Sequence, residues 1–251
     1  MPPIVSIITI TYNAEPFLEK TMRSVLAQTY PHIEYIIIDG GSRDGTVDII
    51  KRYADRLAYW VSEPDKGIYD AMNKGLARAT GAYVWFMNAG DEIFATDTTE
   101  KIMSLPAADV YYGETEFRDL AGRYLGLRSE VTPLGLPARL TWRSLQMGLM
   151  VCHQAILVRK ALACPYDLVH PYSADIDWVI RSLKRANTIT NVHATVAIYL
   201  QGGFSRRHLQ KSLLDRFAIL RKHYGILPTM WNHVRIVFRS LYFLIRKRKR
   251  Y

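Results

Sequence analysis

Apolar runs alternate with helical patterns over the first hundred residues of the chain. Each run is short and rich in β-branched or aromatic residues, which is typical of strands covered on both faces. These runs occupy residues 4–10, 35–38, 59–61 and 83–87. Between them, apolar residues recur with helical spacing within residues 17–26, 47–57 and 68–79. The alternation predicts βαβ units, and hence an α/β fold with a Rossmann-like, mostly parallel sheet and helices on both faces.

Polar residues follow each of the four predicted strands. These strand exits are residues 11–13, 39–42, 62–67 and 88–92. Ligands of open α/β sheets bind at the carboxyl ends of the strands. We therefore expect the four exits to converge on one binding site.

The pattern changes after about residue 105. Short strands are predicted there, together with a helix from about Ala174 to Arg185. The strands are residues 110–113, 124–127, 153–158 and 189–199. No linker rich in Pro or Ser separates this region from the first. Residues 1–205 are therefore predicted to form one domain with two halves, 1–105 and 106–205.

Basic residues are concentrated at the C-terminal end of the 251-residue chain, whose formal net charge is +10. Residues 205–251 hold thirteen Lys and Arg against one acid, whereas the rest of the chain is slightly acidic. A nucleic-acid-binding surface is not expected to divide its charge in this way, so we expect no nucleic acid as a partner.

Residues 206–251 are predicted to form a basic amphipathic helical tail. Apolar residues keep helical spacing from Leu209 to Tyr224, and Pro228 is expected to break this helix. A second apolar stretch, residues 231–245, ends in the basic run 246–250. This composition suits a helix on the surface of an anionic membrane, and packing on the body or on a partner chain is the alternative.

Neither a signal peptide nor an uncharged apolar stretch of about 18 residues is visible in the sequence. The two cysteines, Cys152 and Cys164, are too few for a disulfide framework or a cysteine-rich zinc site. We therefore expect a cytoplasmic protein that lies peripherally on the inner face of the cytoplasmic membrane through its tail.

Two aspartates at the strand exits are candidates for ligand binding. Asp39 precedes two glycines, and its carboxylate could accept hydrogen bonds from a nucleobase or ribose, or it could cap its own turn. Asp91 could coordinate Mg²⁺ or Mn²⁺, since these ions bind one or two carboxylates together with substrate phosphate oxygens. A purely structural Gly-Asp turn is the alternative for Asp91.

Three motifs, in order, resemble the family 2 glycosyltransferases. They are IVSIITITYN at residues 4–13, IIIDGGSRDGT at residues 36–46 and EPDKGIYDAMNKG at residues 63–75. The resemblance extends to about residue 205 and implies a GT-A fold, a nucleotide-diphospho-sugar donor and an inverting reaction. It implies that the first half binds the nucleotide sugar and the second half the acceptor. The donor-site residues that it implies are Thr11, Tyr12, Asn13, Asp39, Asp65, Lys66 and Asn88.

The same resemblance implies a metal site at residues 88–91. The family commonly carries two adjacent acids there; Gly90 stands in place of the first, and Asp91 matches the second, which the family uses on the metal. Asp91 is therefore the expected ligand of Mg²⁺ or Mn²⁺, with Glu92 as the alternative.

An inverting displacement needs one general base for the acceptor hydroxyl. Residues 173–178 begin a predicted helix, whose N-terminal dipole favours an ionised carboxylate. This segment resembles the family's catalytic motif, with Ala174 in place of its Glu, and the match implies Asp175 as the base. Asp177 is the alternative base, and both acids could instead cap the helix.

Two further segments are candidates for contacts with the substrates. His153 and Gln154 match its His-Gln segment on the acceptor side, although a histidine beside a strand is often purely structural. Gly202 and Gly203 could hinge a loop that closes over the donor, bringing Arg206 and Arg207 near its phosphates.

Together these observations predict an inverting, metal-dependent glycosyltransferase with a nucleotide-sugar donor, expected to be a UDP-sugar. The expected transferred group is a hexosyl or N-acetylhexosaminyl unit, and the expected acceptor is a polyprenyl-linked or lipopolysaccharide glycan of the bacterial envelope. The alternative is a non-catalytic nucleotide-sugar-binding module, because Gly90 and Ala174 replace two acids of the family's motifs.

Overall fold

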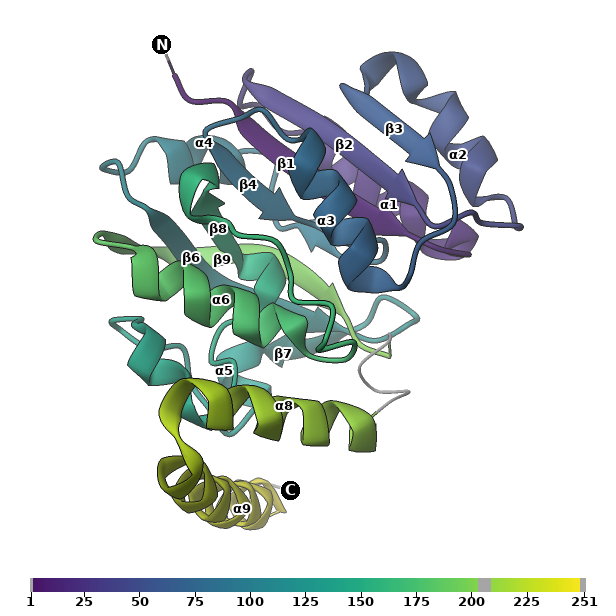
Figure 1. The fold of residues 1–251 in the computed structure, drawn as a ribbon. Helices are drawn as coiled ribbons and strands as arrows, with labels where there is room; N and C mark the ends of the chain where they lie inside the picture. Colours follow the sequence, from purple (N-terminus) through teal and green to yellow (C-terminus); the bar gives the residue numbers. More distant parts are fainter. Residues whose placement is uncertain (1, 203–208, 249–251) are drawn as a thin grey trace.

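The first four apolar runs form an all-parallel part of one sheet in the computed structural model, which describes residues 2–202 and 209–248 (Figure 1). They are β1 (Val5–Thr11), β2 (Ile33–Asp39), β3 (Tyr59–Ser62) and β4 (Tyr83–Phe86). The order β3-β2-β1-β4 is parallel throughout, and its register pairs Thr11 with Asp39 and Asp39 with Ser62. The polar strand exits therefore lie along one edge, as the sequence predicts.

Three helices connect these strands: α1 (Glu15–Leu26), α2 (Thr46–Arg52) and α3 (Ile68–Arg78). Figure 1 shows α3 in front of the sheet and α1 behind it. The apolar positions of α1 and α3 are buried in the core, as helical periodicity predicts. Gly75 lets α3 approach the sheet closely, because a Cβ at this position would lie 2.4 Å from Cγ2 of Ile8.

The second half continues the sheet with mixed strand directions. β6 (Val110–Arg118), β7 (Tyr124–Leu127), β8 (Ile156–Arg159) and β9 (Ile189–Leu200) belong to it, and β5 (Glu92–Ile93) pairs with β9. β8 runs antiparallel to both β4 and β6, whereas β6 and β9 are parallel. Helix α4 (Thr98–Met103) lies at the end of the first half, and the second half contains α5 (Arg128–Val131) and α6 (Ala174–Arg185). The α/β prediction is confirmed, with antiparallel pairings added in the second half.

The strand predicted at residues 153–158 begins later than expected. His153–Ala155 form a turn of 3-10 helix, closed by a hydrogen bond from the Ala155 amide to the Cys152 carbonyl, and β8 starts at Ile156. The indole nitrogen of Trp85 donates to the Gln154 carbonyl at 2.7 Å. These two bonds occupy carbonyls that a strand ladder would otherwise use, which explains the late start of the strand.

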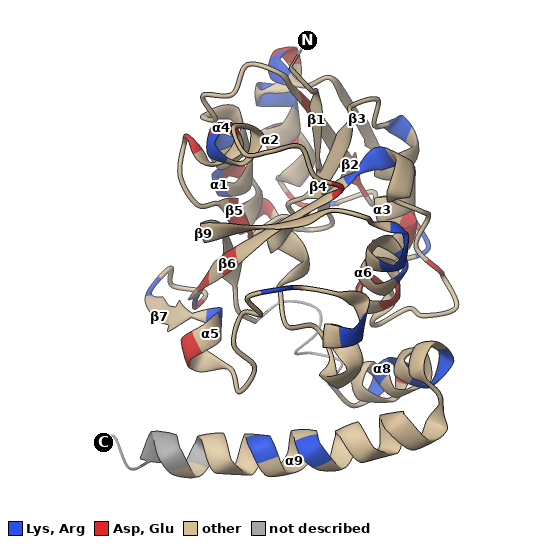
Figure 2. Ribbon diagram, turned by 90° about the vertical axis from the view of Figure 1, so that its left-hand side faces the viewer, with Lys and Arg blue, Asp and Glu red and all other residues tan. Residues whose placement is uncertain are grey.

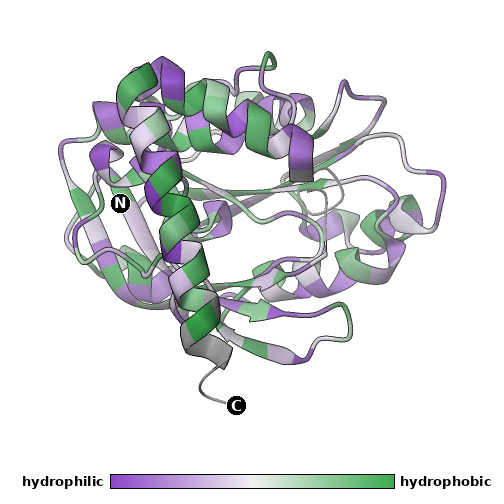
Figure 3. Ribbon diagram, turned by 90° about the horizontal axis from the view of Figure 1, so that it is seen from below, coloured by the Kyte–Doolittle hydropathy of each residue, from purple (hydrophilic) through white to green (hydrophobic). Residues whose placement is uncertain are grey.

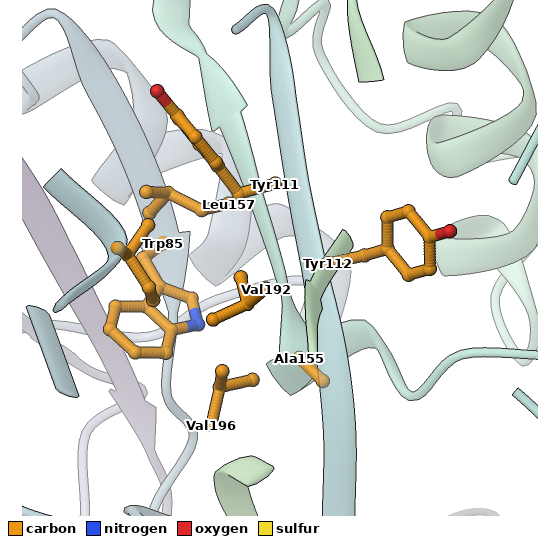
Figure 4. A pocket seen from close by; sticks show the side chains of 8 residues that line it. Trp85, Tyr111, Tyr112, Ala155, Leu157, Val192 and Val196 are labelled. Atoms are coloured by element: carbon orange, nitrogen blue, oxygen red, sulfur yellow. The ribbon is translucent and has the colours of Figure 1, made fainter. Parts of the chain in front are cut away.

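The core between β4, β6, β8 and β9 is filled by large side chains (Figure 4). Trp85 from β4 and Leu157 from β8 lie there together with Val196 from β9. Tyr111 and Tyr112 point to opposite sides of β6. The side chains leave no space for a water molecule. Because such interiors resist rearrangement, the core holds the Gln154 backbone in place.

Two helices follow the sheet: α8 (Leu209–Tyr224) and α9 (Ile226–Arg248). Figure 2 shows α9 running beneath the rest of the molecule. The break between them lies at Gly225, whose φ of 87° favours glycine, and not at Pro228 as predicted. Pro228 lies in the first turn of α9, where its missing amide hydrogen costs no helical bond. No helix in the described ranges is both long and apolar enough to cross a bilayer.

Helix α8 is bound firmly to α6 through buried polar contacts. Asp177 of α6 is fully buried, and its carboxylate accepts a hydrogen bond from Nε2 of His223 at 2.8 Å and pairs with Arg181. Asp215 of α8 accepts hydrogen bonds from the backbone amides of Tyr172 and Ser173, which precede α6. The predicted boundary between body and tail falls within residues 203–208, outside the described residues.

Replacing Gly75 by Val tests the close approach of α3 to the sheet. We expect a loss of about 3 kcal/mol in the free energy of unfolding, since the added atoms overlap with Ile8 in a filled core. The matched control is Gly135→Val, because a Cβ at Gly135 meets nothing within 4 Å. Denaturation with urea measures both variants, and equal midpoints would contradict the packing described here.

Replacing Asp177 by Asn tests the buried contact between α6 and α8. Burial alone would raise the pKa of Asp177, but the hydrogen bond from His223 and the charges of Arg181 and Lys222 bring this pKa well below its usual value. A depressed carboxyl pKa stabilises the fold above the unfolded value of about 3.9, and this contribution fades as the pH falls toward the folded value. We expect a loss of about 3 kcal/mol at pH 7 that shrinks below about pH 4.

Guanidinium denaturation of wild type and Asp177→Asn at pH 7 and pH 3.5 measures this difference. Asp48→Asn removes an exposed acid of α2 and serves as the control. An unchanged midpoint for Asp177→Asn at pH 7 would show that the buried carboxylate does not stabilise the fold.

Candidate functional site

A cavity of about 510 Å³ opens between the two halves of the chain. Its lining includes polar side chains from both halves, and several of them are ionisable. The first half contributes Tyr69, Asn88 and Asp91, helix α8 contributes Arg216, and the second half contributes Arg128, Cys152, His153, Gln154, Asp175 and Tyr199. This combination of a concave site and converging polar groups is typical of a binding site for a small molecule.

Asp91 lies in a tight turn directly after β4. Its amide donates to the Asn88 carbonyl, and Gly90 between them has a φ of 103°, a conformation that L side chains rarely adopt. The backbone of this turn therefore accounts for glycine where the family's first acid is expected.

Asp91 is 5% exposed, and two neutral donors from the second half bind its carboxylate. Its Oδ2 accepts a hydrogen bond from Nε2 of Gln154 at 2.6 Å, and its Oδ1 accepts one from the Leu200 amide at 3.2 Å. Burial raises the pKa of Asp91 to about 7, and the two hydrogen bonds oppose this shift in part. A nearby cation would favour the ionised form.

The residues beside Asp91 fit a divalent metal ion held partly by substrate. Asn88 lines the same cavity, and its Oδ1 is buried and has no hydrogen-bond partner in the structure. Mg²⁺ and Mn²⁺ prefer such oxygen ligands. In residues 2–202 and 209–248, no three His, Cys, Asp or Glu side chains cluster in a way that could hold a metal. Asp91 and Asn88 therefore suit an ion whose other ligands are phosphate oxygens or water.

Asp39 is fully buried at the end of β2, where its carboxylate organises its own loop. It accepts hydrogen bonds from the Ser42 amide at 2.9 Å and from the Ser62 hydroxyl at 2.6 Å. These contacts match the turn-capping alternative from the sequence. Direct contact of Asp39 with a nucleoside stays a prediction.

The other residues predicted for the nucleoside lie along the same edge. A Cβ at Gly40 would lie 2.3 Å from Oδ2 of Asp65 and 3.3 Å from the ring of Tyr12. The missing side chain thus lets these two residues from different strand exits come together. Tyr12 is 62% exposed. An exposed ring beside a carboxylate offers a surface for stacking and hydrogen bonding, as a nucleobase requires.

Three further donor-site candidates differ in their surroundings. Oγ1 of Thr11 is buried and has no hydrogen-bond partner in the structure. Oδ1 of Asn13 accepts a hydrogen bond from the Arg43 amide, which joins the first strand exit to the second. Lys66 is exposed, and its amide donates to Asp70. None of these three residues lines the cavity.

The two candidate bases lie in different environments. Asp175 lines the cavity in the first turn of α6 and accepts a hydrogen bond from the Tyr69 hydroxyl at 3.1 Å. Burial raises the pKa of Asp175, and the bond from Tyr69 and the charge of Arg216 offset this only in part. Asp177 faces α8 instead, in the ion pairs described above, and does not line the cavity.

His153 and Gln154 line the cavity but also serve the fold. Nε2 of His153 lies 2.7 Å from the Tyr166 hydroxyl, and the ring packs against Phe86 and Trp178. Burial lowers the pKa of His153 to about 4, so the imidazole is neutral at pH 7. The Gln154 amide nitrogen is engaged with Asp91. Acceptor binding by these two residues stays a prediction.

The cavity also contains residues that the sequence reasoning missed. Tyr69 lies within the third motif but carries no signal of its own, and Arg128 and Arg216 come from segments without a motif. Arg216 belongs to the predicted tail. Conversely, Gly203, Arg206 and Arg207, predicted to form a closing loop, lie outside the described residues.

Comparison with known proteins agrees with this geometry. The sequence profile of "Glycosyl transferase family 2" matches residues 6–164. A "PGL/p-HBAD biosynthesis glycosyltransferase" of Mycobacterium tuberculosis is 32% identical over 229 residues, which cover 86% of this chain and 85% of that protein. TuaG of Bacillus subtilis, whose name refers to teichuronic acid biosynthesis, is 43% identical over 102 residues, covering 39% of this chain and 40% of TuaG.

Solved structures share the fold at lower sequence identity. TarS 1–349 of S. aureus, solved in complex with UDP, has a TM-score of 0.65 and 18% identity, covering 90% of this chain and 73% of that one. The chain spans 42% of the length of a longer TarS chain with the same TM-score. From the profile match, the mycobacterial relative and the shared architecture, we conclude that the chain belongs to glycosyl transferase family 2 and has the GT-A fold.

Proposed function

We propose that this protein is an inverting, metal-dependent glycosyltransferase that moves a sugar from a UDP-sugar to a lipid-linked glycan of the bacterial envelope. The observation that carries the proposal is a single cavity lined by Asp91 at the exit of β4 and by Asp175 at the start of α6. One acid has the surroundings of a metal ligand, and the other those of a general base.

The donor is proposed to extend from the strand exits into the cavity. Thr11, Tyr12, Asp39 and Asp65 would line the nucleoside part, with Asn13 and Lys66 beside it. The complex of TarS with UDP supports a uridine nucleotide, since the two proteins share a fold. The proposed transferred group is a hexosyl or N-acetylhexosaminyl unit.

Asp91, with Asn88 beside it, is proposed to hold Mg²⁺ or Mn²⁺. The bound ion would supply positive charge that stabilises the departing diphosphate. Gln154 and the Leu200 amide orient the Asp91 carboxylate through the hydrogen bonds described above. Such supporting donors typically matter for affinity because they fix the position of a metal ligand.

The proposed reaction is one displacement at the anomeric carbon. The acceptor hydroxyl oxygen bonds to this carbon as the bond from the carbon to the diphosphate oxygen breaks, and Asp175 takes the hydroxyl proton. The nucleoside diphosphate leaves from the opposite side, so the configuration inverts. The buried position of Asp175 supports this role, since a raised carboxyl pKa makes a stronger base.

The C-terminal helix is proposed to hold the enzyme at the cytoplasmic face of an anionic membrane. One face of α9 contacts the body: Asn232 is buried and donates to Gln146, and Arg239 donates to the Pro133 carbonyl. Figure 3 shows hydrophobic positions along α9 in the view from below. Its exposed apolar residues include Leu227, Met230, Trp231, Val234, Val237, Phe238, Leu241 and Tyr242. An apolar face beside basic residues is typical of an interfacial helix, and it suits a lipid-linked acceptor.

Replacing Asp91 or Asp175 by Asn separates binding from chemistry. Asp91→Asn should abolish the increase in UDP affinity that Mn²⁺ gives, because the proposed ligand is lost. Asp175→Asn should bind UDP with Mn²⁺ within threefold of wild type but lose about 10³-fold in turnover. Calorimetry measures binding, and UDP release measures turnover with the UDP-sugar that stabilises the protein most in a thermal-shift panel.

Asp48→Asn is the control for both variants, since this acid is exposed on α2. Wild type without any turnover would favour the non-catalytic sugar-binding module. Retained turnover in Asp175→Asn would remove Asp175 as the base.

Replacing both Trp231 and Phe238 by Ser tests the membrane proposal. These side chains are 65% and 68% exposed, so their loss should weaken binding to phosphatidylglycerol vesicles at least tenfold while leaving UDP binding intact. Co-sedimentation measures the binding, and Val169→Ser, an exposed apolar residue of a loop, is the control. Unchanged vesicle binding, or a dimer that dissociates in the double variant, would favour a partner chain on this face.

A further inference from the structure

Helix α8 brings a guanidinium group into the cavity. Arg216 lines the cavity between the two halves, and its Nε is buried without a hydrogen-bond partner in the structure. Its side chain runs along Gly148, where a Cβ would lie 3.8 Å from Nη1 and 3.9 Å from Cδ. A buried donor without a partner costs free energy, which a bound ligand would recover.

The contacts next to Arg216 hold it beside the proposed base. The Asp215 carboxylate accepts hydrogen bonds from the backbone amides of Tyr172 and Ser173, which lie just before α6. The hydroxyls of Ser173 and Ser212 lie 3.0 Å apart. The start of α6, which carries Asp175, is therefore tied to the turn of α8 that carries Arg216. This fixed position indicates that Arg216 is a functional side chain and not a solvated residue of the tail.

Arg216 differs from the other arginine of the cavity, Arg128, which is buried. Arg128 donates to the carbonyls of Leu134 and Leu149, so its guanidinium already holds two loop segments. Within residues 2–202 and 209–248, Arg216 forms no ion pair with any carboxylate within 4.0 Å, and its charge acts on Asp175 only from a longer distance. Arg216 is thus the cavity cation whose donors stay available for a ligand.

The sheet order indicates which substrate Arg216 meets. The proposed nucleoside residues lie at the exits of β1, β2 and β3, and Asp91 follows β4. Arg216 lies on α8, which contacts α6, and its side chain passes beside Gly148 of the second half. Figure 1 shows α8 on the side of the molecule away from β1, β2 and β3, and Arg216 lines the same cavity as Asp175, the base that would take the proton of the acceptor hydroxyl.

We propose that Arg216 binds an acidic group of the acceptor, a phosphate or a carboxylate, so that the acceptor is an anionic glycan or glycolipid. A guanidinium matches these groups because its planar donors can form two parallel hydrogen bonds to their oxygens. The proposal rests on the function proposed above, since it takes Asp175 as the base. It makes α8 part of the active site.

Calorimetry with three small probes tests this proposal in the full chain, with UDP and Mn²⁺ present. The probes are octyl β-glucuronide, which carries a sugar carboxylate, farnesyl phosphate, which carries a lipid phosphate, and neutral octyl β-glucoside. Wild type should bind at least one acidic probe tenfold or more tightly than the neutral one. Arg216→Gln should reduce this preference to less than threefold, and Arg216→Lys should keep an intermediate part of it.

The matched control is Arg221→Gln, since Arg221 is exposed on the same helix and should keep the full preference. Preference for the glucuronide alone identifies a sugar acid, and preference for the phosphate alone identifies the lipid carrier. Equal binding of acidic and neutral probes by wild type would overturn the proposal, as would an unchanged preference in Arg216→Gln. Weaker UDP binding in Arg216→Gln with a normal melting temperature would also overturn it, because Arg216 would then serve the donor.

The same experiment separates failure of this inference from failure of the proposed function. Wild type that does not bind UDP with Mn²⁺ would contradict the function itself. Wild type that binds UDP but shows no preference for acidic probes would contradict only the role of Arg216.

Discussion

The hydrogen bond between Gln154 and Asp91 joins the two halves of the site, and the rest of the arrangement depends on it. Asp91 ends the parallel part of the sheet, whereas Gln154 precedes the antiparallel strand β8. The Gln154 backbone is fixed in turn by Trp85 in a filled core. A buried carboxylate with only neutral donors is poorly compensated, so its pKa rises to about 7. Because the negative charge of Asp91 at the cavity wall is not balanced by a positive charge among the described residues, a bound cation is favoured there.

The parallel register and the C-terminal helices position the remaining groups around that carboxylate. The pairing of β1, β2 and β3 aligns three polar strand exits along one edge. The missing side chain of Gly40 lets Tyr12, after β1, and Asp65, after β3, come close together. In the second half, the hydrogen bonds of Asp215 with the segment before α6 and of Asp177 with His223 hold α8 against α6. The two helices after the sheet therefore have different relations to the site: α8 contributes to the cavity, whereas α9 presents an apolar face outward.

Local patterns in the sequence predicted most of the fold and part of the site. Strands covered on both faces and amphipathic helices follow from periodicity, and α6 has the predicted bounds, Ala174 to Arg185. Asp91 and Asp175 could be named because each lies in a motif. The sequence predicts the helix break at Pro228 and the structure has it at Gly225, because a proline is also common in the first turn of a helix and so does not by itself locate the break.

Features that depend on contacts distant in sequence could not be predicted in the same way. Nothing local distinguishes Asp175 from Asp177, and only the packing of α8 shows that one lines the cavity while the other forms ion pairs. Arg216 looks like any basic residue of an amphipathic helix until the fold brings it beside Gly148. Gly90 departs from the family's pattern, and its φ of 103° is a conformation that favours glycine.

The most direct test of this account is the position of manganese in crystals grown with UDP and Mn²⁺. Anomalous diffraction locates the ion independently of any assumption about the site. The account predicts a peak within coordination distance of the Asp91 carboxylate, in contact with the diphosphate of UDP. A diphosphate bound away from Asp91, or a manganese peak at another group of acids, would contradict it.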